Sequence, residues 1–186
     1  AIANIRVNTL RESVNQTIAV DGVDVPIFFD TAADVRDLQI NNGTLTIDGL
    51  GSISGDLSIK SETVNVGATE TSTLAIGLAN LNGNLTPGGV GAVFSAGEGA
   101  VFVERITVDG VITSNGYALD LGGNVELSGV SGVTLEAENL NVRYNRLGRA
   151  VDNMIILAGE QDYVLNLLDN ESRLSGEISA DIAGMI

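Results

Sequence analysis

Short stretches in which apolar and polar residues alternate recur along the whole 186-residue chain, separated by Gly, Asn and Asp. In GTLTIDG at residues 43–49, Leu45 and Ile47 fall on one face and Thr44 and Thr46 on the other, as in a strand with one buried face. Turn-forming residues separate such stretches at 21–22, 41–43, 109–110, 115–116 and 122–123. The pattern predicts an all-β chain with little helix and with most strands under about eight residues.

The alternation also predicts which side chains are buried. We expect one set of apolar residues to point inward, namely Leu45, Ile47, Leu57, Ile59, Val64 and Val66. Thr44, Thr46 and Ser58 are expected to point outward.

Apolar strand positions recur at a spacing of about 19 residues, for example from Phe102 to Leu121 to Leu140. Coils of this length with Gly and Asn at their corners are typical of a β-solenoid, so we predict an elongated, right-handed β-helix-like solenoid. Alternating strands also align at many offsets by chance, and an elongated antiparallel β-sheet or sandwich fits the same alternation.

A longer repeat underlies the short one. The segment IRVNTLRESVNQTI at residues 5–18 returns as VRYNRLGRAVDNMI at residues 142–155, and GTLTIDGLG at 43–51 returns as GEISADIAG at 176–184. Two matched blocks in the same order predict one β-rich module over residues 1–137 and the start of a second copy over residues 138–186. We therefore expect the sequence to be part of a longer tandem array.

The boundary between the two copies has its own features. The segment LEAENLNVRYN crosses it without Gly or Pro, so Leu140, Val142 and Tyr144 are predicted to lie in a core shared by residues on both sides. Five of the nine basic residues lie in the two matched segments: Arg6, Arg11, Arg143, Arg146 and Arg149. Either they lie on a solvated loop, or they pair with carboxylates of the adjoining module, for which Glu160, Asp162, Asp169 and Glu171 are candidates.

Charge and composition exclude several classes of function. The net charge is −15, which opposes binding to nucleic acid or to an anionic membrane. The chain contains no Cys and no His, so disulfides, thiolate metal sites and histidine bases are excluded. No apolar run approaches the roughly 18 residues of a membrane-spanning helix. Acidity of this kind fits an extracellular protein that must avoid self-association, although a saline habitat is an alternative explanation.

Only one cofactor site is conceivable from the sequence. Asp21, Asp24 and Asp30 lie close together along the chain, and carboxylates with loop carbonyls are ligands for calcium, but the spacing differs from that of an EF-hand and Asp-Gly is first of all a turn dipeptide. No catalytic residue and no other cofactor site is predicted.

Two segments resemble a known class of proteins. The run DVPIFFDTAADVRDLQINNGTLTIDGLGSISGDLSIKSETVNVG at residues 24–67 and the run YALDLGGNVELSGVSGVTLEAENLNVRYN at residues 117–145 resemble the tandem β-rich modules of giant secreted and surface repeat proteins of Gram-negative bacteria. The resemblance implies an extracellular, adhesin-like stalk, often exported by type I secretion. The glycine- and aspartate-rich nonapeptide calcium repeats that often lie near the export signal are not found in this sequence.

These features together predict a non-enzymatic structural repeat of a long bacterial surface or secreted protein, with neighbouring modules of the same chain as its partners. One alternative is a self-assembling filament or surface-layer subunit whose strand edges pair between chains. Another is a polysaccharide-active β-helix enzyme, which would need two facing carboxylates in a groove.

Overall fold

The computed structural model describes residues 2–48, 51–86, 91–130 and 133–182, and these ranges contain strands and no helix. The strands are β1 (Ile2–Asn8), β2 (Val14–Val20), β3 (Val23–Phe29), β4 (Asp34–Ile47), β5 (Gly51–Val66), β6 (Thr69–Leu85), β7 (Gly91–Val108), β8 (Val111–Val130), β9 (Val133–Asn145), β10 (Val151–Ala158), β11 (Gln161–Leu167) and β12 (Ser172–Ile182). The prediction of an all-β chain is confirmed. Within the described ranges, no helix has the length and apolarity to cross a membrane.

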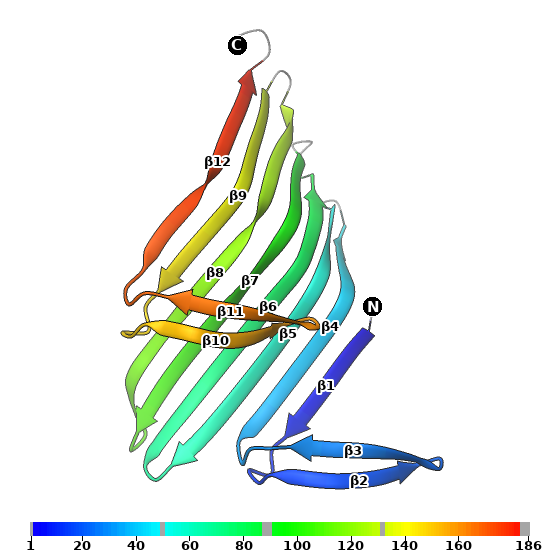
Figure 1. Cartoon of the computed structure of the whole chain (residues 1–186), viewed down its shortest axis with the longest axis vertical. Helices are drawn as coiled ribbons and strands as arrows, with labels where there is room; N and C mark the ends of the chain where they lie inside the picture. Colours follow the sequence, from blue (N-terminus) through cyan, green and yellow to red (C-terminus); the bar gives the residue numbers. More distant parts are fainter. Residues whose placement is uncertain (1, 49–50, 87–90, 131–132, 183–186) are drawn as a thin grey trace.

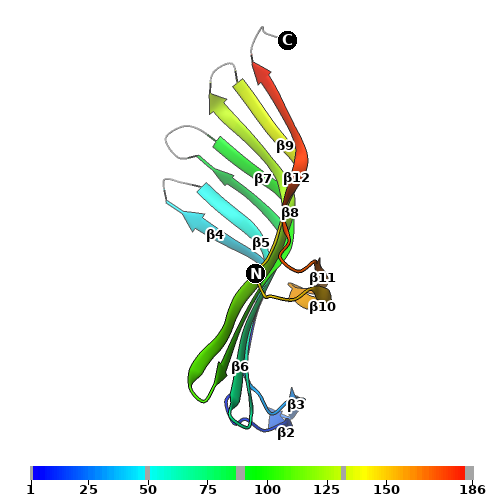
Figure 2. The same ribbon diagram turned by 90° about the vertical axis from the view of Figure 1, so that its left-hand side faces the viewer.

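Eight strands form one long sheet in the order β1-β4-β5-β6-β7-β8-β9-β12 (Figure 1). All neighbours in this sheet pair antiparallel. The remaining four strands form two separate hairpins, β2–β3 and β10–β11, which lie on the same side of the sheet (Figure 2). The structure is therefore the elongated antiparallel sheet of the two architectures considered, and the described strands do not stack as the parallel coils of a solenoid.

The long strands explain the spacing of about 19 residues seen in the sequence. Successive strands of the sheet begin at residues 51, 69, 91, 111 and 133, so the spacing is one long strand with its turn. The prediction of strands under about eight residues is wrong for β4–β9 and β12, which have 11 to 20 residues. Residues 21–22 and 109–110 form turns, but residues 41–43, 115–116 and 122–123 lie inside strands.

Bulges let the strands continue through these Gly and Asn residues. Every strand pair of the sheet from β4–β5 to β9–β12 has a register shift near its middle, for example between Ile40 and Gly43 and between Ser175 and Glu177. The pairs β6–β7, β7–β8 and β8–β9 each have a second shift. Asn42 has a φ of 51° and Gly176 a φ of 152°, conformations that Asn and Gly tolerate best. The bulges cross the sheet as a line, and the sheet bends midway along its strands (Figure 2).

The two matched segments have the same order of elements. In residues 5–18, β1 ends at Asn8 and β2 begins at Val14; in residues 142–155, β9 ends at Asn145 and β10 begins at Val151. In both cases a hairpin follows, and the next strand returns to pair antiparallel with the strand before the hairpin. The prediction that the two segments share one backbone conformation is confirmed at this level, with one difference: β10 has a bulge between Val151 and Met154 that β2 lacks.

The predicted inward face is not the most deeply buried one. Ser58, expected to point outward, is 4% exposed, whereas Leu45 is 61% and Val66 72% exposed. Leu57 and Ile59 are half-buried, Val64 is exposed, and Thr44 and Thr46 are exposed as expected. The side chain of Ile47 lies outside the described residues. The reason for the reversal is that hairpin β10–β11 covers the face with the small and polar residues.

Candidate functional site: the hairpin docking surface

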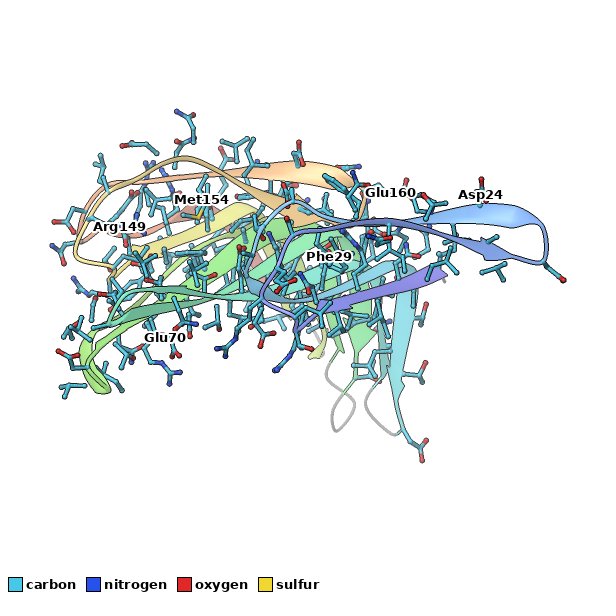
Figure 3. All side chains as sticks on the ribbon, turned by 90° about the horizontal axis from the view of Figure 1, so that it is seen from below. Asp24, Phe29, Glu70, Arg149, Met154 and Glu160 are labelled. Carbon is cyan, nitrogen blue, oxygen red and sulfur yellow. The ribbon has the colours of Figure 1, made fainter. Side chains whose placement is uncertain are left out.

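Hairpin β10–β11 runs across the sheet, from Arg149 at its base to Glu160 at its tip (Figure 3). It contacts β5, β6 and β7 through β10, and β7, β8 and β9 through β11. The contact encloses a cluster of buried apolar residues, whose members are Ala100, Phe102, Ala118, Leu147, Val151, Ile156, Leu165 and Leu167. We call this cluster and the residues around it the docking surface.

Small residues on the sheet make room for the hairpin. Ala100 and Ala118 are fully buried. Gly77 on β6 pairs with Ala100, and Gly116 lies two residues before Ala118 on β8. A Cβ atom on Gly77 would lie 2.0 Å from the carbonyl oxygen of Leu157, and one on Gly116 would lie 2.2 Å from the carbonyl oxygen of Arg146. The backbone of the hairpin therefore lies directly against the backbone of the sheet.

Gly77→Ala is expected to lower the free energy of unfolding by about 1–3 kcal/mol, because the added methyl group has no space and must push the hairpin away from the sheet. Urea unfolding monitored by circular dichroism measures this loss. Gly122→Ala is the matched control: a Cβ there would make an ordinary contact 3.5 Å from the carbonyl oxygen of Leu140. An equal loss in both variants would contradict the close approach.

Polar side chains of β4 and β5 hold the tip of the hairpin. The Ser58 hydroxyl accepts a hydrogen bond from the backbone N–H of Gly159 at 3.0 Å, and Gln39 donates to the carbonyl of the same residue. The Asn41 side chain donates to the Glu160 carboxylate at 2.9 Å. These bonds join residues that are more than 100 positions apart in the sequence, so they fix how far the hairpin reaches across the sheet.

Asn145 organises the loop that leads into the hairpin. Its side chain is fully buried, and its Nδ2 donates to the carbonyls of Arg149 and Leu168, both at 2.8 Å. Its Oδ1 accepts from the backbone N–H of Leu147 at 3.0 Å. Because these three bonds tie Asn145 to residues both before and after the hairpin, the chain turns out of β9 and into β10 in one defined direction.

A charged cluster lies below the base of the hairpin. Arg143 pairs with Asp120 of β8 and with Glu171, both at 3.3 Å, and donates to the carbonyl of Asn166 in the hairpin. Burial, together with the carboxylates of Asp120 and Glu98, raises the pKa of the nearby Tyr163 to about 12. Tyr163 thus keeps its proton far into the alkaline range.

The raised pKa predicts a loss of stability at high pH. The phenol of Tyr163 ionises near its ordinary value of 10 in the unfolded chain but only at about 12 in the folded protein. Its contribution to stability is therefore complete below pH 10 and is lost as the pH rises through about 12. Tyr163→Phe should reduce this alkaline loss and remove the late phase of phenolate absorbance; an unchanged titration would contradict the assignment.

Hairpin β2–β3 repeats the polar contacts of β10–β11 at its base. Asn8 donates to the carbonyl of Glu12 at 2.9 Å and accepts from the N–H of Leu10 at 3.1 Å, which matches two of the three bonds of Asn145. Arg6 donates to the carbonyl of Phe28 at 2.7 Å, as Arg143 does to the carbonyl of Asn166. The matched residues of the sequence are therefore the ones that set the direction of each hairpin.

Most of the arginines singled out in the sequence have acidic or aromatic partners. Arg6 lies 3.8 Å from Asp37 and 5.0 Å from the ring of Phe29, and Arg149 lies 3.0 Å from Glu104 of β7. Arg146 donates to Asn170 and to the hydroxyl of Tyr144. Arg11 lies in the loop after β1 with a φ of 57°.

Glu171 is the one member of the predicted acidic set (Glu160, Asp162, Asp169 and Glu171) that pairs with an arginine among the described ion pairs. Arg143 also pairs with Asp120 on β8, and Arg149 pairs with Glu104 on β7. The sequence pattern did not point to Asp120 or Glu104 as partners.

The predicted boundary residues contact the preceding strands. Leu140 and Val142 line an apolar hollow of about 350 Å³ with Leu121 and Phe94, on the face opposite the hairpins. Tyr144 is half-buried and stacks on Tyr117 with 5.4 Å between the ring centroids. Residues before and after position 138 therefore share contacts here, but Val142 is 40% exposed, so the prediction that all three residues lie in one shared core is wrong for Val142.

The three aspartates considered for calcium are not brought together. Asp21 lies in the β2–β3 turn, Asp24 near the start of β3, and Asp30 beyond the end of that strand, so Asp24 and Asp30 are at opposite ends of the hairpin (Figure 3). Among the residues that the structure describes, no group of three or more acidic side chains could hold a metal ion.

No protein-family model, no curated protein and no solved structure matches this chain.

Proposed function

We propose that this chain is a non-enzymatic structural repeat module of a long extracellular bacterial surface or secreted protein, in which it acts as a stalk or spacer for adhesion or cell-surface contact. One observation carries the proposal: the strand–hairpin–strand unit formed by β1–β4 occurs again as β9–β12, and the second hairpin lies on the strands that follow the first unit. Residues 1–137 are then one module and residues 138–186 the start of the next.

In a repeat built in this way the sheet grows in the hydrogen-bonding direction, perpendicular to its strands. Each copy adds six strands to the sheet, those equivalent to β1 and β4–β8. At about 4.8 Å between neighbouring strands, one copy adds roughly 29 Å to the length. Because β9 belongs to both copies and pairs with β8, no flexible linker separates them.

The surface chemistry supports a spacer more than an enzyme. The net charge of −15 keeps neighbouring molecules apart at the high local concentration of a cell surface. The apolar hollows along the line of bulges contain few polar side chains that could act on a substrate, and the polar side chains of the docking surface are used to hold the hairpin.

A chain with one more copy tests the proposal. Residues 1–141 joined directly to residues 5–186 keep the matched positions in register, since Asn4 corresponds to Asn141. We call this the two-copy chain. Small-angle X-ray scattering should show a stiff particle that is longer than the 186-residue chain by about 25–30 Å with an unchanged cross-section. Freely hinged modules would contradict the spacer function.

One observation favours the filament alternative: β1 and β12 are the two ends of the sheet, and among the described strands neither has a partner on its outer edge. Pairing of these edges between chains would build a fibre without any longer gene product. Sedimentation over a range of concentrations separates the two functions, because a spacer stays monomeric and a filament subunit grows in mass as its concentration rises.

A further inference from the structure

We infer that the inner face of hairpin β2–β3, together with the free edge of β1, is a docking surface for the sheet of a preceding copy of this module. The hairpin would lie on strands of the β5–β8 type, in the geometry that β10–β11 adopts on β5–β8. The inference rests on the proposed function and adds to it the surface through which one copy holds the next.

The inner faces of the two hairpins have the same pattern. In both hairpins a two-residue turn separates the strands, so positions can be matched by counting from the turn: Ile18 pairs with Val25, and Ile156 pairs with Tyr163. By the same count, Val20, Ile27 and Phe29 correspond to Ala158, Leu165 and Leu167, and Val14, the partner of Phe29, corresponds to Val151, the partner of Leu167. These positions are apolar in both hairpins apart from the hydroxyl of Tyr163, and each inner face also carries one glutamine, Gln16 in the first hairpin and Gln161 in the second.

The inner face of the second hairpin is buried more deeply than that of the first. Ile156 is 4% exposed, whereas Ile18, at the matched position, is 49% exposed. The first hairpin extends beyond β1, away from the strands of the sheet, while the second lies over them (Figures 1 and 3). An isolated two-stranded hairpin is at best marginally stable in water, so an apolar inner face of this kind requires a surface to pack on.

The polarity of the hairpin identifies the side that needs cover. The opposite face of β2–β3 is mixed, because Asn15, Thr17 and Asp24 pair there with Phe28, Pro26 and Ala19. The sequence therefore separates one mainly apolar face from one mixed face in a hairpin that contacts no sheet within the described chain except at its base.

The hydrogen bonds at the base of the first hairpin are like those that orient the docked hairpin. Arg6 and Asn8 make the contacts that Arg143 and Asn145 make at the base of the docked hairpin. β1 itself corresponds to β9, whose other edge pairs with β8. A preceding copy would thus meet the first hairpin and the edge of β1 at the same time.

The side chains identify what the receiving sheet must look like. It needs small residues like Gly77 and Gly116, because only a bare backbone admits the hairpin so closely. At the tip the fit differs: a Cβ on Gly159 would lie 2.5 Å from the Cβ of Asp56, and Asp21 occupies the matched position in the first hairpin. Elsewhere Phe29 and Val20 are larger than Leu167 and Ala158, and Val25 is smaller than Tyr163, so the total volume is nearly kept.

Thiol labelling in the two-copy chain tests the inference. The natural chain has no Cys, so a single introduced cysteine is the only reactive thiol. Ile18→Cys should react rapidly with a maleimide in the 186-residue chain. In the second copy of the two-copy chain, with Asp21→Gly to relieve the tip, it should react about tenfold more slowly or less, because labelling then requires local opening.

Two controls give the scale. Ala19→Cys, on the opposite face of β2, should react at the same rate in both chains, and Ile156→Cys should be slow in both. Rapid labelling at Ile18→Cys in a two-copy chain that scatters as a stiff particle would overturn the docking surface and leave the spacer function intact. Rapid labelling in a freely hinged chain would overturn both.

Discussion

Asn145→Ala is expected to lower the free energy of unfolding by about 3–5 kcal/mol, since it removes three hydrogen bonds made by a fully buried side chain. The carbonyls of Arg149 and Leu168 and the N–H of Leu147 would lose this partner. Chemical unfolding of the 186-residue chain measures the loss.

Asn8→Ala is the matched control, because Asn8 makes two of these bonds in a loop that no sheet covers. Its effect should be about 1–2 kcal/mol. If Asn145→Ala cost no more than Asn8→Ala, the loop after β9 would not be the element that holds the second hairpin on the sheet.

Ile156→Ala is expected to lower the free energy of unfolding by about 2–4 kcal/mol, because it opens a cavity in the buried cluster between the hairpin and the sheet. Ile18→Ala removes the same atoms at the matched position of the first hairpin, where the side chain is half in water, and should cost under about 1 kcal/mol.

The comparison becomes sharper in the two-copy chain. There, with Asp21→Gly in the second copy, Ile18→Ala in that copy should approach the cost of Ile156→Ala, because the side chain would be covered by the first copy. Equal losses for Ile18→Ala and Ile156→Ala in the 186-residue chain would show that the two hairpins already pack alike and would contradict the structure.

The sequence predicted the all-β class and the matched segments, and it did so for physical reasons. Alternation of period two in GTLTIDG reports directly on strand geometry, and the match of Asn8 with Asn145 reflects one loop that must be built twice. Strand length could not be read in the same way. Asn-Gly in residues 41–43 favours a turn locally, but bulges paired across neighbouring strands turn it into a bend within a long strand.

Burial was also decided by tertiary contacts that alternation does not contain. Leu57 and Ser58 alternate as a half-buried strand should, and yet the covered face is that of Ser58, because a hairpin more than 100 residues away lies on it. Small residues such as Gly77 and Ala100 mark that contact. In a chain with 23 glycines, however, Gly77 was equally compatible with a turn. Arg143 and Arg149 could be singled out from the matched segments, whereas their partners Asp120 and Glu104 could be identified only from the fold.

Hydrogen exchange of β1 tests most directly the claim that the sheet continues from one copy into the next. The junction of the two-copy chain gives a peptide of unique sequence, so its second β1 can be distinguished from the first by mass spectrometry. In the 186-residue chain, the amides of β1 that point away from β4 should exchange rapidly, because that edge has no partner. In the two-copy chain the same amides, now bonded to the β8 of the first copy, should be protected as those of β9 are. Rapid exchange in both chains would contradict a continuous sheet.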